Sequence, residues 1–187
     1  LGAFDAAPMS RVDVALTGGS LETDGAGTLL IARSRLRAAA ADSGVGEAGL
    51  CERLAALFGL ERVMPLDIDG PVDGAVRFVD TTTIVYQQCD DPADPRWASL
   101  QALAASLAGL RTGAGAPYRL VALPWPRARL SAAGERLPLS YASFLIINNA
   151  VLVPTYDDLA DAEALVRLTQ CFPGRDVVGI DCLSVVE

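Results

Sequence analysis

Short runs of apolar residues alternate with polar turns along the chain, and three stretches show them in the same order. Each stretch predicts two short strands, a helix and one further strand. The three predicted units cover approximately residues 12–66, 74–124 and 141–182. Their closing strands begin near residues 62, 119 and 176, a spacing of 57 residues each time. This regularity favours repeated ββαβ units that pack on one another over the alternative, an ordinary α/β domain whose spacing is coincidental.

The helix of the first unit has the clearest pattern. The predicted elements of this unit are strands at 12–17 and 28–31, a helix at 47–58 and a closing strand at 62–66. Apolar residues at helical spacing predict one buried face of the helix, formed by Leu50, Leu54, Leu57 and Phe58. Gly59 is expected to end the helix. Residues 38–46 are rich in Ala, Gly and Ser and predict a loop that makes a mobile excursion from the domain.

The other two units repeat this order. In the second unit we expect strands at 76–79 and 84–86, a helix opening near Asp94-Pro95 and a closing strand at 118–124. In the third unit we expect strands at 144–147 and 151–154, a helix from Asp157 or Asp158 to Pro173-Gly174, and a closing strand at 176–180. The two strands of the third unit are joined by Asn148-Asn149, which suits a tight turn because asparagine tolerates positive φ.

Composition excludes several kinds of chemistry. A chain of 187 residues with 51% hydrophobic and 20% charged residues fits one folded domain with a real core. The sequence contains no His and no Lys, and all 15 basic residues are Arg. A Ser–His or Cys–His pair, an imidazole zinc site and a lysine Schiff base are therefore excluded for the chain as given. We expect no metal and no organic cofactor.

Charge and cysteine pattern limit the partners. A net charge of −8 opposes binding to nucleic acid or to anionic membrane surfaces. No apolar run is long enough to span a membrane. The four cysteines lack CxxC spacing and predict reduced thiols in a cytoplasmic protein. The chain starts with Leu-Gly-Ala-Phe-Asp, neither a start Met nor a signal peptide, so we expect it to begin partway through a longer protein.

Paired aspartates and most cysteines have a structural explanation in the sequence. Asp90-Asp91 and Asp157-Asp158 lack the alternating spacing of a calcium loop and fit helix capping better. Cys51 and Cys171 fall within predicted helices and are expected to be structural. Cys89 is expected to be a poor nucleophile because neighbouring carboxylates raise the pKa of a thiol.

Three stretches of the chain carry further motifs: GGSLETDGAGTLL at 18–30, DGPVDGAVRFV at 69–79, and a third set running from LPLSY at 137–141 through Asn148 and VP at 153–154 to FPGRDVVGI at 172–180. Together, in this order, they resemble the agmatine deiminase and bacterial-type peptidylarginine deiminase family. The resemblance covers nearly the whole chain. It implies an α/β fold of ββαβ units in a pseudo-fivefold propeller, the pentein, with about three of the five units present. Residues 1–187 would then form a single partial domain.

The resemblance also implies a reaction. Family members bind a planar, permanently cationic guanidinium between carboxylates, and a Cys thiolate attacks its carbon. A His protonates the departing ammonia, and water releases a ureido product. The implied partner is thus a small cationic guanidinium compound, agmatine more than protein-bound arginine, and the implied product from agmatine is N-carbamoylputrescine, a step of putrescine biosynthesis.

The residues of this reaction match only in part. Asp73 stands where the family has a guanidinium-binding aspartate and is the one candidate for both substrate binding and catalysis. Pro71 stands in place of the family's His, and Thr17 in place of a Glu. The resemblance places the nucleophilic Cys after Glu187 and a second aspartate before Leu1. We therefore expect the chain by itself to be inactive.

Three interpretations stay open at this point. The chain is a segment of an active agmatine deiminase, or a pseudoenzyme that still binds a guanidinium through Asp73, or an unrelated α/β domain. Cys182 is nearest to the nucleophile position but is predicted within the closing strand, where a buried small residue is the simpler explanation. Arg77 is interpreted either as a cation on a strand face or as a partner for Asp73, and we favour the pairing because an unpaired carboxylate in a cleft is unfavourable. Exposed apolar edges of an incomplete ring would favour a homo-oligomer.

Overall fold

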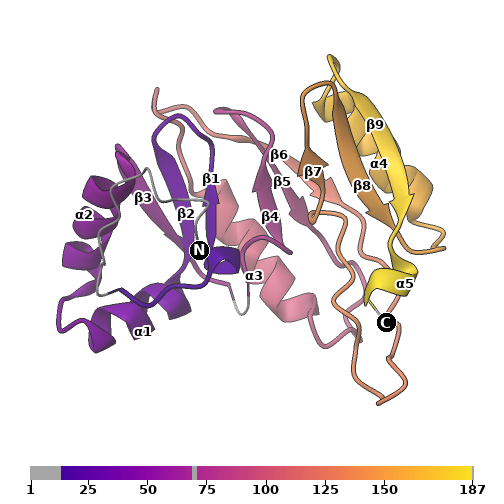
Figure 1. The fold of residues 1–187 in the computed structure, drawn as a ribbon, viewed down its shortest axis with the longest axis horizontal. Helices are drawn as coiled ribbons and strands as arrows, with labels where there is room; N and C mark the ends of the chain where they lie inside the picture. Colours follow the sequence, from indigo (N-terminus) through magenta and orange to yellow (C-terminus); the bar gives the residue numbers. More distant parts are fainter. Residues whose placement is uncertain (1–13, 69–70, 187) are drawn as a thin grey trace, which may run out of the picture.

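The computed structural model describes residues 14–68 and 71–186, and in this part of the chain nine strands form three separate sheets. The sheets stand side by side in Figure 1. Their strands are β1 (Leu21–Thr23), β2 (Thr28–Ala32) and β3 (Arg62–Leu66); β4 (Val76–Phe78), β5 (Thr83–Gln87) and β6 (Arg119–Leu123); β7 (Leu145–Ile146), β8 (Ala150–Thr155) and β9 (Asp176–Asp181). We call these sheets, with their helices, the first, second and third units.

Every unit has the same topology. Its first strand is antiparallel to the second, and the second is parallel to the third. A parallel pair needs a long crossover, which helices supply in each unit. The helices are α1 (Arg33–Asp42) and α2 (Glu47–Phe58) in the first unit, α3 (Trp97–Ala108) in the second and α4 (Asp161–Cys171) in the third, followed by a short α5 (Leu183–Val186). The predicted ββαβ repeat is confirmed.

The strand register makes positions in the three units equivalent. The parallel pairs begin at Thr28–Arg62, Thr83–Arg119 and Ala150–Asp176. Counting from these pairs, equivalent positions on one face of the sheets are occupied by Leu30, Val85 and Leu152, and by Met64, Val121 and Val178. In the first two units this face is covered by the next unit. In the third unit Val178 is 41% exposed and Leu145, which pairs with Leu152, is 58% exposed.

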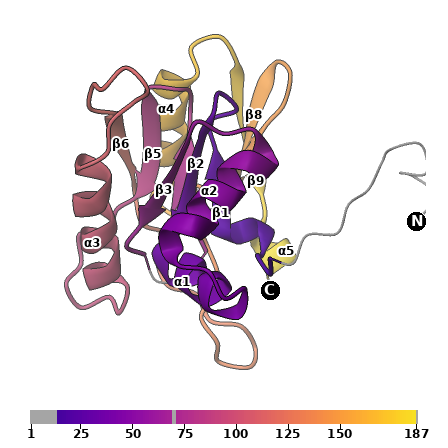
Figure 2. The same cartoon turned by 90° about the vertical axis from the view of Figure 1, so that its left-hand side faces the viewer.

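Over residues 14–68 and 71–186, this arrangement forms three hydrophobic cores. One core lies within the first unit, where Ile31 packs with Leu36, Leu50 and Leu54 of α1 and α2. Figure 2 shows these two helices in front of the first sheet. A second core joins the first unit to the second and includes α3. A third core joins the second unit to the third and includes α4. Neighbouring units therefore hold each other together through shared apolar side chains.

Several predicted boundaries were wrong. Residues 14–17 of the predicted strand at 12–17 are not a strand, whereas Val12 and Asp13 lie outside the described residues. The first strand instead follows a short 3₁₀ helix, Gly18–Ser20. The predicted loop at 38–46 largely forms α1 and its end, because Ala favours helix and three of its residues, Leu36, Ala39 and Ala40, are buried.

Helix α2 agrees with the prediction at its ends but not on its whole buried face. It spans Glu47–Phe58, and Gly59 follows it in the left-handed conformation at φ 64°. Leu50 and Leu54 are buried as expected. The last turn, however, leaves Leu57 45% and Phe58 58% exposed. Helices α3 and α4 begin at Trp97 and Asp161, three residues or so after the predicted starts, because turns precede both.

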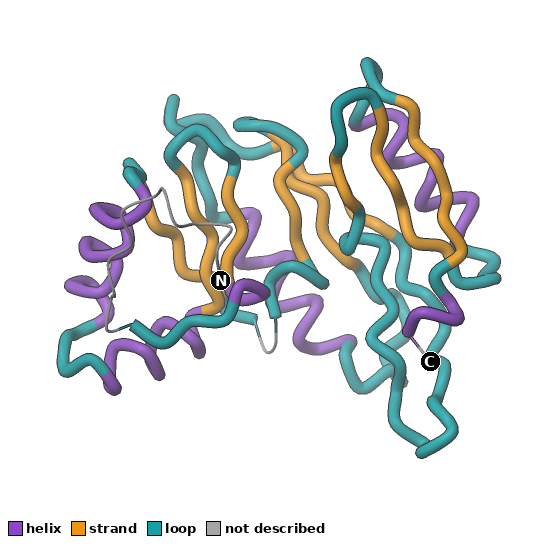
Figure 3. The backbone as a smooth tube through the Cα atoms, viewed as in Figure 1, coloured by secondary structure: helices purple, strands orange, loops and turns teal. Residues whose placement is uncertain are grey.

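A long segment, residues 124–140, connects the second and third units without regular helix or strand (Figure 3). It is closed on itself by an isolated bridge between Leu130 and Arg136. Arg136 donates from both terminal nitrogens to Asp94, at 3.0 and 2.9 Å, and its guanidinium lies 5.3 Å from the ring centre of Trp125. Trp125 Nε1 also donates to Asp94, at 2.9 Å. These contacts attach the segment to the turn that precedes α3.

Candidate functional site

Asp73 lies in the turn immediately before β4, at the seam between the first and second units. The backbone N–H groups of Val72 and Asp73 donate to the carbonyl oxygen of Gly19, at 2.7 and 3.3 Å. The turn is closed by hydrogen bonds from Ala75 and Val76 to the carbonyl of Val72, whose side chain is fully buried. The Asp73 side chain itself is exposed. The seam thus holds an accessible carboxylate on an anchored backbone.

The glycine turn at 18–20 provides the surface on which this carboxylate rests. A Cβ atom placed on Gly19 would lie 3.0 Å from Asp73 Oδ2 and 3.1 Å from Oδ1. Beside it, the hydroxyls of Thr17 and the buried Ser20 are 2.6 Å apart, which closes the 3₁₀ helix. Two of the sequence motifs, one containing Gly19 and one containing Asp73, therefore meet in space.

A partly buried ion pair crosses the same seam just beyond the turn. Glu22 Oε2 on β1 lies 3.0 Å from Arg77 Nε on β4, and Glu22 Oε1 accepts the Phe78 N–H at 3.0 Å. Only 12% of the Glu22 side chain is exposed. Burial raises the pKa of Glu22, and the charge of Asp73 raises this pKa further, whereas Arg77 and the Phe78 N–H lower it without cancelling the effect.

Arg77 continues the contact into the third unit. Its Nη1 donates to the carbonyl oxygen of Phe144 at 2.8 Å, and its guanidinium lies 4.8 Å from the centre of the Phe144 ring. The predicted pairing of Arg77 with Asp73 was wrong, because within the described residues the ion pair of Arg77 is with Glu22. The reason given for this pairing was that an unpaired carboxylate in a cleft is unfavourable. It does not apply, since Asp73 is exposed and does not need a buried counter-ion.

Pro71 and a cavity adjoin the Asp73 turn. Pro71 and Gly74 line a cavity of about 260 Å³ together with Trp125, Arg136 and Leu139. The 124–140 segment therefore covers one side of the turn that holds Asp73. Pro71 is exposed and has no group that could transfer a proton.

The four cysteines are free thiols, and the surroundings of three of them do not favour a nucleophile. Cys89 is buried, and burial with the nearby Asp94, Asp91 and Asp90 raises its pKa. Burial likewise raises the pKa of Cys51, in α2, and of Cys171, in α4. A raised pKa keeps the thiol protonated and disfavours attack on an electrophile. Cys182 directly follows β9 instead of lying within it.

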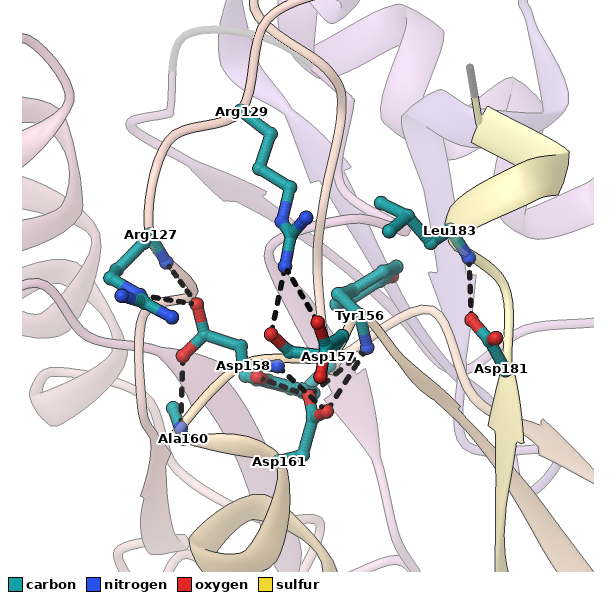
Figure 4. A network of polar contacts seen from close by, with 10 residues as sticks. Arg127, Arg129, Tyr156, Asp157, Asp158, Ala160, Asp161, Asp181 and Leu183 are labelled. Atoms are coloured by element: carbon teal, nitrogen blue, oxygen red, sulfur yellow. Dashed lines mark hydrogen bonds and ion pairs between the residues drawn. The ribbon is translucent and has the colours of Figure 1, made fainter.

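The paired aspartates of the third unit connect the turn before α4 to the 124–140 segment. Figure 4 shows Arg127 and Arg129, both from the 124–140 segment, against the turn before α4. Arg127 donates through its backbone N–H and its Nε to Asp158 Oδ2, both at 3.1 Å. Arg129 donates to the Asp157 carbonyl at 2.7 Å, and Asp161 Oδ2 accepts the Asp158 N–H at 3.0 Å. Over residues 14–68 and 71–186, no cluster of three or more acidic or cysteine side chains suits a metal ion.

The sequence of the chain matches a family model over residues 2–187, described as Porphyromonas-type peptidyl-arginine deiminase. The chain belongs to this family. Curated proteins that are similar to this chain are described as candidate agmatine deiminases. A Vibrio parahaemolyticus protein described as a candidate agmatine deiminase is 28% identical over 199 residues, which cover 94% of this chain and 55% of that protein.

Solved structures agree with the family membership and with the expected pentein fold. A Porphyromonas gingivalis protein described as a candidate arginine deiminase is 44% identical, with a TM-score of 0.87 over 94% of this chain and 54% of that one. A C. jejuni agmatine deiminase variant with substrate bound is 28% identical, with a TM-score of 0.85 over 98% of this chain and 56% of that one. The chain spans about half the length of these relatives. No helix in the described part is long and apolar enough to cross a membrane.

Sequence reasoning missed the role of Glu22 and the partner of Arg77. Glu22 pairs with Leu30 across its hairpin, and Arg77 pairs with Val85. Because Leu30 and Val85 are equivalent in the repeat, opposite charges occupy equivalent positions of successive units. An alignment of the first strands of the first two units by their hairpin turns would have placed Glu22 and Arg77 at the same position, and the opposite charges would have indicated a pair.

Proposed function

We propose that Asp73 binds the guanidinium group of a small cationic substrate, and that the chain is part of an agmatine deiminase. The main support is the accessible carboxylate of Asp73, held on an anchored turn at the position that matches the family's guanidinium-binding aspartate. A carboxylate can accept two parallel N–H bonds from a planar guanidinium, which fixes the orientation of the cation.

In the whole protein, the reaction that this role serves is agmatine plus water to N-carbamoylputrescine plus ammonia. A Cys thiolate outside residues 1–187 would attack the guanidinium carbon, ammonia would leave, and water would release the ureido product. Asp73 would keep the carbon in line with the thiolate. This reaction places the whole protein in polyamine metabolism, and we propose a cytoplasmic location for it.

The chain alone is proposed to bind without turnover. Pro71 cannot donate the proton that departing ammonia requires, and the pKa values of Cys51, Cys89 and Cys171 are raised. A second candidate function, a pseudoenzyme or guanidinium-binding module, is favoured by the same Pro71 and by Thr17, which both replace family side chains at separate points of the site.

Calorimetric titration of the chain tests the binding role. Agmatine is expected to bind, and putrescine, which has amines but no guanidinium, is expected not to bind. The Asp73→Asn variant should weaken agmatine binding about tenfold or more, since charge-assisted hydrogen bonds contribute roughly 1.5–3 kcal/mol. Asp176→Asn is the matched control, because it removes an exposed carboxylate in the third unit. Equal affinity of wild type and Asp73→Asn would refute the binding role.

An ammonia-release assay with agmatine tests the proposal that the chain alone has no deiminase activity. No turnover is expected from the chain alone. Turnover that is lost in Asp73→Ala would show that a group within the chain acts as nucleophile, contrary to the proposal.

A further inference from the structure

We infer that Gly19 is a positioning residue for Asp73, and that a side chain at position 19 would displace the carboxylate that contacts the guanidinium. This inference rests on the proposed binding role of Asp73 for its functional part. The contact between the two residues is a separate claim, which can be tested without a ligand.

The space above Gly19 is occupied by the Asp73 carboxylate. A Cβ atom on Gly19 would lie 3.0 Å from Oδ2, 3.1 Å from Oδ1 and 3.2 Å from Cγ of Asp73. These distances are shorter than ordinary van der Waals contacts of a Cβ atom, so the neighbouring atoms would have to move by a few tenths of an ångström. Because the carboxylate is the exposed end of a rotatable side chain, it is the group that moves.

The main chain of Asp73 cannot follow this movement. Its N–H and that of Val72 both donate to the carbonyl oxygen of Gly19. The strand that follows the turn, β4, is also fixed to β1. Glu22 on β1 accepts the Phe78 N–H and pairs with Arg77, and both of these residues lie on β4. The same glycine therefore fixes the backbone of Asp73 through its carbonyl and leaves room for the side chain through its missing Cβ. Displacement would occur by rotation about the side-chain bonds of Asp73.

Backbone conformation does not explain a glycine at this position. Gly19 is not among the described glycines with positive φ, which include Gly25, Gly27 and Gly59. Alanine is therefore compatible with the backbone at position 19, and the contact with Asp73 is the specific obstacle. Gly18 belongs to the same 3₁₀ helix, also lacks positive φ, and has nothing within 4 Å of its Cβ position. Gly18→Ala is thus a matched control for Gly19→Ala.

The first experiment is an agmatine titration of the full 187-residue chain. Gly19→Ala is expected to raise the Kd about tenfold, because bidentate pairing depends on the position and angle of the carboxylate. Gly18→Ala is expected to stay within about twofold of wild type, as surface substitutions without contacts have small effects. If Gly19→Ala binds as tightly as wild type, or if Gly18→Ala weakens binding equally, positioning by Gly19 is wrong.

A double-mutant cycle on thermal unfolding tests the contact when no ligand is present. Gly19→Ala should change Tm less favourably in the wild-type background than in the Asp73→Ala background, because the carboxylate has to shift only when Asp73 is present. In the Asp73→Ala background the same substitution should leave Tm unchanged or raise it, because the obstructing carboxylate is gone and alanine restricts the unfolded chain. An equal change of Tm in both backgrounds would overturn the inference. A wild-type chain that fails to bind agmatine would contradict the proposed function, and the thermal cycle would still decide the contact between Gly19 and Asp73.

Discussion

Arg136 is the residue whose loss gives the clearest energetic prediction. It attaches the 124–140 segment to Asp94 by two hydrogen bonds and lies against Trp125. Only 11% of the Asp94 side chain is exposed. Burial alone would raise the pKa of Asp94, but hydrogen bonds from Arg136, the Arg96 N–H and Trp125 lower it from 3.8 to about 2. The Arg136→Met substitution keeps an unbranched apolar side chain beside Trp125 and removes the charge and both hydrogen bonds.

The expected cost follows from the pKa of Asp94. A pKa lowered by nearly two units corresponds to about 2 kcal/mol of stability at neutral pH, of which Arg136 supplies the largest part. We expect Arg136→Met to destabilise the chain by about 1–2 kcal/mol and to lower Tm by about 2–8 °C. Since the folded-state pKa lies below the unfolded value, this stabilisation is complete above pH 4 and is lost as pH falls towards 2. The difference between wild type and variant should therefore shrink over that range.

Urea unfolding at pH 7, pH 4 and pH 2.5 provides the assay. Arg127→Ala is the control within the same segment, because its ion-pairing side chain is 67% exposed and its backbone N–H is retained. Its partner Asp158 is only 3% exposed, but in the variant this carboxylate keeps the N–H donors of residue 127 and Ala160, so the loss is expected to be smaller than in Arg136→Met. A loss in Arg136→Met that is the same at all three pH values would refute the electrostatic explanation and leave packing against Trp125 as the cause.

Three further predictions concern the seam and the third sheet. Because the pKa of Glu22 is raised in the fold, its ionisation costs stability as pH rises through that pKa, so Glu22→Gln should become more stable relative to wild type between pH 4 and pH 7 in urea titrations. Thr17→Glu restores the carboxylate that the family has before the glycine pair, and it should tighten agmatine binding about tenfold by calorimetry, whereas Thr17→Gln should not. Val178 and Leu145 leave an exposed apolar face, so the chain should self-associate in sedimentation experiments, and Val178→Glu should reduce this association; a monomeric wild type would contradict it.

The sequence predicts the local elements of this fold well. Helix α2 and its end at Gly59 were found because periodicity and a left-handed glycine are both local signals. The start of the first strand was misplaced because residues 12–17 have the same apolar character as a strand, and only pairing with β2 selects Leu21–Thr23. The exposure of Phe58 depends on what surrounds the helix end, which periodicity cannot report.

Some residues of the candidate site could likewise be predicted from the sequence, and others could not. Asp73 was identified from its motif, since the motif records chemistry at a fixed spacing. Glu22 and Arg77 form a contact between units, 55 positions apart in the chain, and their pairing depends on how two sheets are set side by side. The contact of Gly19 with Asp73 is of the same kind. Three-dimensional placement was needed for both.

The two shared cores give the second unit a special place in the energetics of the chain. Among the described residues, its side chains contribute to the core with the first unit and to the core with the third, whereas each outer unit shares a core with one neighbour. Arrays of this kind lose structure from their ends, because a terminal unit can open while the remaining contacts persist. Amide protons of β5, which lies between β4 and β6, should consequently exchange with solvent most slowly. The middle of the chain then acts as the last cooperative unit to unfold.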